Sequence, residues 1–291
     1  MGKFRSFFYV IFPLLFLSAC KKKKEDAETY YRGNLTVYTD ESFVSVVQAL
    51  ADAYAIAYPE AKISVETEKE DLSFLRLLKK EARLIVLSRS LTEKEQEEYK
   101  RITGLKFTPA PFAADALVFI VPKNDSRDSV SVSEIDKLLS SDEKPIIFDG
   151  ANASNLNFIA QRLGKKANSL KYSVLPGNKE ILMNISKFPG KIGAVSLNSL
   201  SRQYDPKTNE LMSGIKILKV YDGKDSYLPD MQSLRSMEYP FTRVVYFLEN
   251  EGSFLLANGF VRFSCTHVGQ KVVQKEGLQP YNLYKREVQM R

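Results

Sequence analysis

The chain has 291 residues, 44% of them hydrophobic and 26% charged, so it can bury a full core and can divide into two lobes. Its formal net charge of +7 suits an anionic ligand or surface, whereas its evenly spread lysines argue against nucleic acid as the partner. The chain has two cysteines, and lipidation of Cys20 would leave Cys265 as the one free thiol. A single free thiol excludes a disulfide framework and a paired-cysteine metal site.

Residues 1–20 have the pattern of an export signal. A short basic start precedes an apolar run from Phe7 to Leu17, which is too short to span a bilayer comfortably. The closing tetrapeptide Leu17-Ser18-Ala19-Cys20 resembles the bacterial lipobox, which implies cleavage before Cys20 and lipidation of its thiol. Residues 21–33 are polar and predict a flexible tether, whose lysines either touch anionic lipid headgroups or serve as a solvated spacer.

The first predicted structural unit is a strand that turns directly into a helix. Leu35 to Tyr38 are β-branched or apolar, and apolar residues then recur at helical spacing from Phe43 until Pro59 ends the run. The first amides of such a helix are unpaired and favour small anions, and the hydroxyls of Thr39 and Ser42 could add donors. Alternatively, Thr39 or Asp40 only caps the helix.

Strand and helix patterns alternate after this unit, which predicts a parallel sheet with helices on its faces. The strand 84–87 ends at Ser88, Arg89 and Ser90, and Thr92 with Glu95 predicts a capping box for the next helix. Because parallel strands end at the same edge, we expect residues 88–90 to face the same crevice as Thr39. Arg89 either offers a bidentate fork to an oxyanion or pairs with a nearby carboxylate.

A third polar junction follows the strand 145–148. The turn Asp149 to Asn155 is rich in Gly, Asn and Ser, and apolar residues at helical spacing follow it, although a plain loop and cap would have the same pattern. Upstream, the prolines of 108–111 should not continue a central strand, so we place a lobe boundary before the apolar strand 115–122. Further on, Gly193 lies in a strand where a side chain would be unwelcome.

Several separated segments carry a resemblance to one known family. They are Tyr239-Pro240-Phe241-Thr242-Arg243, Gly259 to Phe263, Gly269 to Val273 and Gly277 to Pro280, with upstream matches at 39–43, 88–92, 115–121 and 191–195. In this order they resemble the phosphate-binding proteins of bacterial phosphate ABC transporters, over nearly all of the chain after the tether.

The resemblance implies an α/β, two-lobed periplasmic-binding-protein-like fold (type II) with the ligand cleft between the lobes. Lobe I would comprise 34–113 and 222–291, and lobe II 114–221. The implied oxyanion-binding residues are Thr39, Ser42, Ser88, Arg89, Ser90, Asn152, Ser154 and Asn155. The turn departs from the family pattern, because Ser154 alone keeps a hydroxyl while Ala153 and Asn155 replace small or hydroxyl-bearing residues.

The implied function is capture of a small oxyanion, with inorganic phosphate as the leading ligand, for an ABC transporter permease. The implied location is the cell envelope, on the periplasmic side or exposed at the surface, with the membrane contacted through the lipid anchor. The alternative is a lipoprotein with a degenerate cleft that contacts other envelope proteins. We expect no cofactor, no metal and no enzyme activity, since common catalytic motifs are missing and His267 and Cys265 fit a helix-surface residue and a core thiol.

Overall fold

The computed structural model describes residues 27–202 and 204–282. The predicted signal segment, Cys20 and the first part of the predicted tether lie outside the described residues. Among the helices of the described ranges, none has both the length and the apolar character needed to cross a membrane.

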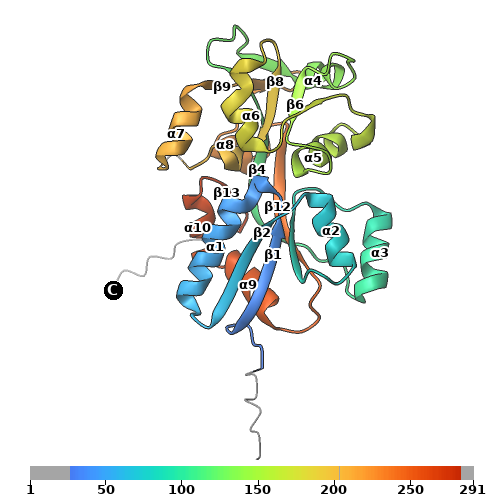
Figure 1. The fold of residues 1–291 in the computed structure, drawn as a ribbon, viewed down its shortest axis with the longest axis vertical. Helices are drawn as coiled ribbons and strands as arrows, with labels where there is room; N and C mark the ends of the chain where they lie inside the picture. The colour runs from blue at the N-terminus through green and yellow to red at the C-terminus, as the bar shows by residue number, and fades with distance from the viewer. Residues whose placement is uncertain (1–26, 203, 283–291) are drawn as a thin grey trace, which may run out of the picture.

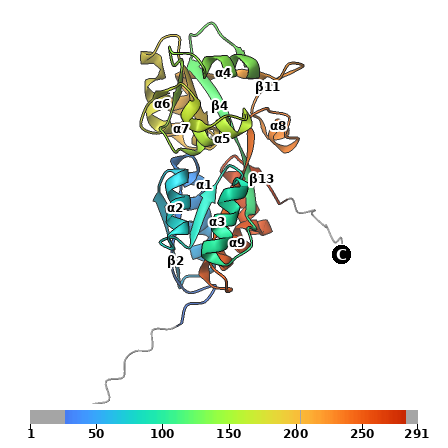
Figure 2. The same ribbon diagram turned by 90° about the vertical axis from the view of Figure 1, so that its right-hand side faces the viewer.

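A curled sheet links two halves that are stacked along the long axis of the molecule (Figure 1). The strand order in the lower half is β2 (Ala61–Thr67), β1 (Gly33–Thr39), β3 (Leu84–Leu87) and β12 (Thr242–Glu249). Next comes β4 (Ala110–Pro122), which runs from one half into the other (Figure 2). In the upper half the order continues with β8 (Ile192–Ser196), β6 (Ile146–Phe148) and β7 (Ser173–Val174).

The strands β1, β2 and β3 are parallel, as are β6, β7 and β8, whereas β4 and β12 are antiparallel to their neighbours. This mixture confirms the predicted α/β class. The shorter strands are β9 (Ile215–Ile217) and β13 (Gln279–Pro280), which pair with β4, and a separate small sheet of β5 (Ser129–Ser131), β10 (Lys219–Tyr221) and β11 (Ser226–Tyr227).

Helices cover both faces of the lower sheet. One core cluster joins the sheet to α1 (Val44–Ala57), α9 (Leu256–Cys265) and α10 (His267–Lys275), and the other joins it to α2 (Glu70–Leu78) and α3 (Glu93–Thr103). Leu84 and Val86 face the first cluster while Ile85 and Leu87 face the second, so β3 is buried on both faces, as the period of two in a strand requires.

The upper half has its own core cluster, built on β4, β6 and β8. Its helices are α4 (Val132–Leu138), α5 (Ser154–Arg162), α6 (Asn178–Asn184), α7 (Pro206–Ser213) and α8 (Met231–Arg235). Leu234, Tyr239 and Phe241 pack in this cluster although they follow residue 221, where predicted lobe II ends. A Cβ on Gly193 would lie 2.6 Å from Ile181 and 2.8 Å from Ile120, which confirms that a side chain is unwelcome there.

Two local predictions have different outcomes. The capping box of α3 is confirmed, because the Thr92 side chain accepts from the Glu95 amide while Glu95 accepts from the Thr92 amide. The expectation that 108–111 cannot continue a central strand is wrong, since β4 begins at Ala110 and pairs with β12 through Pro111. The register shifts opposite Pro111, between Val245 and Tyr246, and this bulge tolerates a residue that has no amide hydrogen.

Candidate functional site

Two strand-to-helix junctions meet between the halves of the molecule. After β1, Asp40 caps the 3₁₀ turn η1 (Glu41–Phe43), which leads directly into α1. After β6, a loop leads to Ser154 at the amino end of α5. Thr39, Asp40, Ser42, Ser154 and Asn155 are each 0% exposed, and we call them, with Asn178 and Arg243, the buried centre.

The Asp40 carboxylate connects the two junctions. Its Oδ1 accepts from the Ser42 amide at 3.1 Å, and its Oδ2 accepts from the Ser154 amide, also at 3.1 Å. The Ser154 hydroxyl donates to Ser42 Oγ at 3.1 Å. The first amide of α5, a position that favours an anion, is therefore occupied by a carboxylate of the protein itself.

Asparagine side chains extend this network across the upper half. Asn178 donates from Nδ2 to Ser42 Oγ at 3.2 Å, while its Oδ1 accepts from Asn155 Nδ2 at 2.9 Å and from the Ser196 amide at 3.1 Å. The backbone carbonyl of Ser42 accepts from Ser196 Oγ at 3.2 Å and from Asn198 Nδ2 at 2.9 Å. Direct hydrogen bonds thus hold the two halves together around η1.

Arg243 supplies a fully buried positive charge. Its side chain is 0% exposed, and Asp115 Oδ2 lies 2.8 Å from Nη2 and 2.9 Å from Nε. Nη2 also donates to Asn155 Oδ1 at 2.9 Å, and the guanidinium lies 4.7 Å from the centre of the Phe43 ring. Nη1 is buried without a hydrogen-bond partner among the described residues, which is costly for a charged donor.

A second acidic side chain, Asp149, lies beside the buried centre. Burial is the main cause that raises the pKa of this carboxyl, and the negative charge of Asp40 adds to it, whereas Lys69 opposes the shift. Lys69 Nζ donates to the Asp149 carbonyl at 2.8 Å and lies 3.9 Å from Oδ2. Asn178 Nδ2 donates to the same Oδ2 at 3.3 Å. The centre therefore holds carboxylates and one buried guanidinium in close proximity.

The predicted residues 88–90 lie apart from this network. The Ser88 amide and hydroxyl both donate to Glu70 Oε1, at 2.7 and 2.9 Å. Arg89 forms ion pairs with three carboxylates: Glu95 at 2.8 Å, Asp71 at 3.0 Å and Glu70 at 3.6 Å. Because its guanidinium is already paired with these carboxylates, Arg89 links α2 and α3 through ion pairs.

Ser90 and Asn152 lie at the rim between the halves. The backbone of Ser90 exchanges two hydrogen bonds with the Gln161 side chain, at 3.0 and 2.9 Å. Asn152 is exposed in a left-handed conformation with φ of 59°, and its carbonyl accepts from the Asp71 amide at 3.3 Å. Of the predicted site residues, the structure thus brings together Thr39, Ser42, Ser154 and Asn155, and it places Ser88, Arg89, Ser90 and Asn152 around them.

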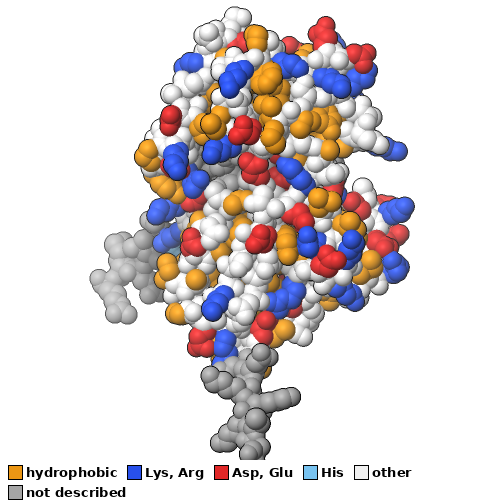
Figure 3. Space-filling model, in the orientation of Figure 1, with side chains coloured by type: hydrophobic (Ala, Val, Ile, Leu, Met, Phe, Trp, Pro, Cys, Tyr) orange, Lys and Arg blue, Asp and Glu red, His pale blue; other side chains and the backbone are white. Residues whose placement is uncertain are grey.

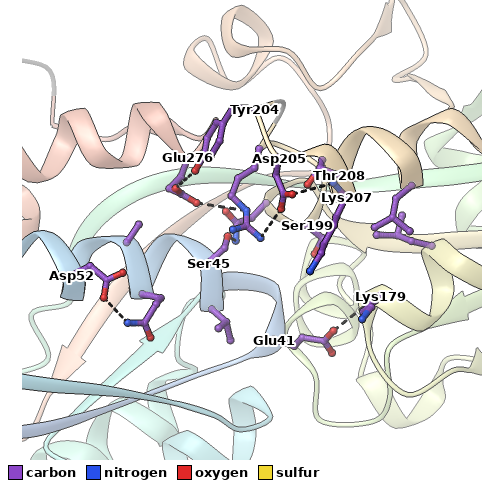
Figure 4. A pocket seen from close by; sticks show the side chains of 17 residues that line it. Glu41, Ser45, Asp52, Lys179, Ser199, Tyr204, Asp205, Lys207, Thr208 and Glu276 are labelled. Atoms are coloured by element: carbon purple, nitrogen blue, oxygen red, sulfur yellow. Dashed lines mark hydrogen bonds and ion pairs between the residues drawn. The ribbon is translucent and has the colours of Figure 1, made fainter.

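Two grooves flank the buried centre without reaching it. One, of about 630 Å³, has Ser45 and Asp52 of α1 on one wall and Lys179 and Lys207 on the other (Figure 4). The other, of about 700 Å³, lies between α2, α3 and α5 and includes Arg89. Neither lining includes a residue of the buried centre, although the first includes Glu41 of η1, and the residues of the centre are at most 1% exposed, so the centre is closed in this conformation.

Sequence reasoning did not single out Arg243 or its partner Asp115 as site residues. Each is the one charged residue at the start of an apolar strand run, a pattern that could have marked both. Within the described ranges, no group of three or more His, Cys, Asp or Glu residues could hold a metal ion. On the face drawn in Figure 3, basic and acidic side chains are interspersed over both halves, so the excess positive charge is not gathered into one patch there.

Comparisons with known proteins identify relatives over most of the chain. The family model described as "PBP superfamily domain" matches residues 24–267. The phosphate-binding protein PstS of Pseudomonas aeruginosa is 21% identical over 277 residues, covering 85% of this chain and 83% of the relative. An ABC-type phosphate transport receptor from Vibrio cholerae has a TM-score of 0.64 at 16% identity, covering 85% of this chain and all (100%) of that one. PstS from Borrelia burgdorferi has a TM-score of 0.55 at 18% identity, with coverages of 86% and 99%.

Proposed function

Since the chain belongs to the PBP superfamily, we propose that it is an extracytoplasmic solute-binding lipoprotein that captures a small oxyanion, with inorganic phosphate as the leading ligand. Support for phosphate comes from the relatives, whose names describe phosphate-binding and phosphate-transport proteins. In this role the protein would bind without catalysis and pass its ligand to an ABC transporter permease.

The observation that carries this proposal is the unpaired Nη1 of Arg243. A buried guanidinium with an unmade hydrogen bond gains free energy from an oxyanion that can accept it. The amino ends of η1 and α5 lie beside it, and helix amino ends favour negative charge. We therefore propose Arg243 as the cation of the site, together with Thr39, Ser42, Ser154 and Asn155.

The four predicted site residues outside the buried centre remain proposed ligand contacts. Ser88, Arg89, Ser90 and Asn152 would border the path by which the ligand reaches the centre when the halves separate. We also propose the two predicted lobes with one change of boundary. The chain would return to the first lobe at about residue 242, because Leu234, Tyr239 and Phe241 pack in the upper core.

One observation favours the alternative function. The Asp40 carboxylate already accepts from the Ser154 amide, and the residues of the buried centre are at most 1% exposed, so an anion that binds this amide must displace the Asp40 contact. A chain whose own carboxylate fills the anion position could stay closed without a solute and act as an interaction component of the cell envelope.

Calorimetry on the chain that begins after Cys20, with phosphate and sulfate as titrants, tests the proposal. Saturable binding that Arg243→Lys weakens and Arg89→Lys leaves unchanged would support the buried centre. The reverse pattern would assign the cation role to Arg89. If no anion binds at millimolar concentration, the solute-binding function fails and the interaction function replaces it.

The proposed location has a separate test. Replacing Cys20 with Ala should release the protein from membranes or stall its processing, because the lipid is then not attached. Normal processing with full membrane retention of Cys20→Ala would contradict the lipoprotein assignment.

A further inference from the structure

Exposed aromatic side chains gather at the lower end of the molecule, where the described chain begins. We call Tyr30, Tyr31, Tyr58 and Phe254 the aromatic pole. The Tyr30 ring centre lies 4.9 Å from that of Tyr31, 6.0 Å from Tyr58 and 5.4 Å from Phe254. Tyr30 and Tyr31 are each 39% exposed and Phe254 is 49% exposed, whereas Tyr58 is partly buried against the lower core, so three of the four joined rings face solvent.

The aromatic pole is held firmly by the fold, although Tyr30 and Tyr31 belong to the segment 21–33 that the sequence predicts to be a flexible tether. The Tyr54 hydroxyl donates to the Tyr30 carbonyl, and α9 packs so closely that a Cβ on Gly259 would lie 2.7 Å from that carbonyl oxygen. Tyr30, Tyr58 and Phe254 also line a groove of about 400 Å³. Large apolar groups fixed on the surface in this way are typical of an interaction surface.

The pole has basic neighbours. The Arg262 guanidinium lies 5.9 Å from the centre of the Phe254 ring, and Arg262 is exposed. In the sequence, four consecutive lysines (Lys21 to Lys24) precede Tyr30, with Glu25, Asp26 and Glu28 between them, and Glu28 forms an ion pair with Arg83. Tyrosine rings with an apolar body and a polar tip, beside Lys and Arg, are suited to the headgroup level of an anionic bilayer.

The short distance in sequence between the aromatic pole and the proposed lipid anchor indicates the membrane as the partner of the pole. Cys20 and Thr29 are nine positions apart, and a fully extended chain of that length spans at most about 30 Å. A lipid on Cys20 would therefore hold the pole close to the membrane surface, where even a weak contact is populated because the effective concentration is high.

We propose that the aromatic pole rests on the membrane that holds the anchor, with its rings at headgroup level and Arg262 facing anionic lipids. This inference rests on the proposed lipid anchor. Figure 1 shows that the N-terminal end of the described chain leaves the molecule at the lower end of its long axis, so the contact would orient this axis away from the membrane surface. The upper half would then lie farthest from the bilayer.

The chain contains no tryptophan, so a single introduced tryptophan reports its own surroundings. The full processed protein carrying Phe254→Trp is reconstituted in phosphatidylcholine vesicles with phosphatidylglycerol and a headgroup-proximal quencher lipid. The matched control is Met183→Trp, because Met183 is 53% exposed and lies on α6 in the upper half. Tyr31→Trp serves as a second reporter if Phe254→Trp fails to fold.

We expect loss and a blue shift of tryptophan emission at position 254 and neither change at position 183. Protein that floats with the vesicles but shows equal emission from both reporters overturns the membrane contact and leaves the anchor intact. Protein that does not float with the vesicles overturns both the anchor and the inference that rests on it.

Discussion

Replacing Asp40 with Asn removes the negative charge that occupies the amino end of α5. In the native chain the two carboxylate oxygens accept from the amides of Ser42 and Ser154, each at 3.1 Å. Asparagine has one oxygen, so it can keep the cap of η1 but not the second bond. Asn and Asp cap helices about equally well, so the cost comes from the lost bond to the buried Ser154 amide, and we expect the free energy of unfolding to fall by about 1–3 kcal/mol.

Phosphate affinity should rise although stability falls. A hydrogen bond to a charged group is worth about 1.5–3 kcal/mol, and an anion entering the native centre must displace the bond between Asp40 and Ser154. Without that competitor, Asp40→Asn should bind phosphate about 10- to 100-fold more tightly than the native chain. The loss of one negative charge near Asp149 acts in the same direction.

Calorimetric titration of both proteins with phosphate at pH 7 measures this gain, and thermal melts measure the stability. The matched control is Asp205→Asn, because Asp205 also caps a helix through an amide two residues ahead, at 3.0 Å, but does not contact the centre. The reasoning is refuted if Asp40→Asn binds no more tightly than the native chain, or if the control gains as much.

Three further changes test the fold around the site. Arg243→Ala breaks a fully buried ion pair and should lower the free energy of unfolding by about 3–5 kcal/mol in urea, whereas Arg101→Ala, whose side chain is 68% exposed, should change it by less than about 1 kcal/mol. Gly193→Ala should cost about 1–3 kcal/mol by overpacking against Ile120, and an unchanged urea midpoint would contradict that contact. Burial is the main cause that raises the pKa of Glu249 to about 7, and the charge of Glu251 adds to it. The folded chain therefore holds the proton of Glu249 more tightly than the unfolded chain does, so stability falls as the pH rises from about 4.5 to 7. Glu249→Gln should therefore stabilise the protein by about 1 kcal/mol at pH 8 and leave it nearly unchanged at pH 5, and equal effects in urea titrations at both pH values would contradict this.

The local parts of the fold could be predicted from the sequence because their causes are local. The change from strand to helical spacing after Thr39 marks the junction between β1 and α1. The capping box of α3 requires only Thr92 and Glu95, three residues apart. The turn 149–155 could be placed before a helix because apolar residues at helical spacing follow it, and the helix α5 begins at Ser154, near the end of that turn.

The composition of the centre could not be predicted in this way, because its contacts join residues far apart in the chain. Arg243 and Asp115 are 128 positions apart, and they meet because β12 and β4 pair antiparallel with that register. The ion pairs of Arg89 with Asp71 and Glu70 likewise depend on how α2 packs beside β3. The residue types identified candidate side chains for the site. Tertiary contacts decide that Arg89 is paired with three carboxylates, whereas Arg243 keeps Nη1 without a hydrogen-bond partner among the described residues.

Amide and guanidinium NMR signals followed during a phosphate titration give the most direct test of the central claim, that the buried centre receives the oxyanion. We predict saturable shifts of the Ser42 and Ser154 amides and of the Arg243 side chain, with smaller changes at Arg89. Shifts confined to surface lysines, or no shifts at millimolar phosphate, would contradict the account.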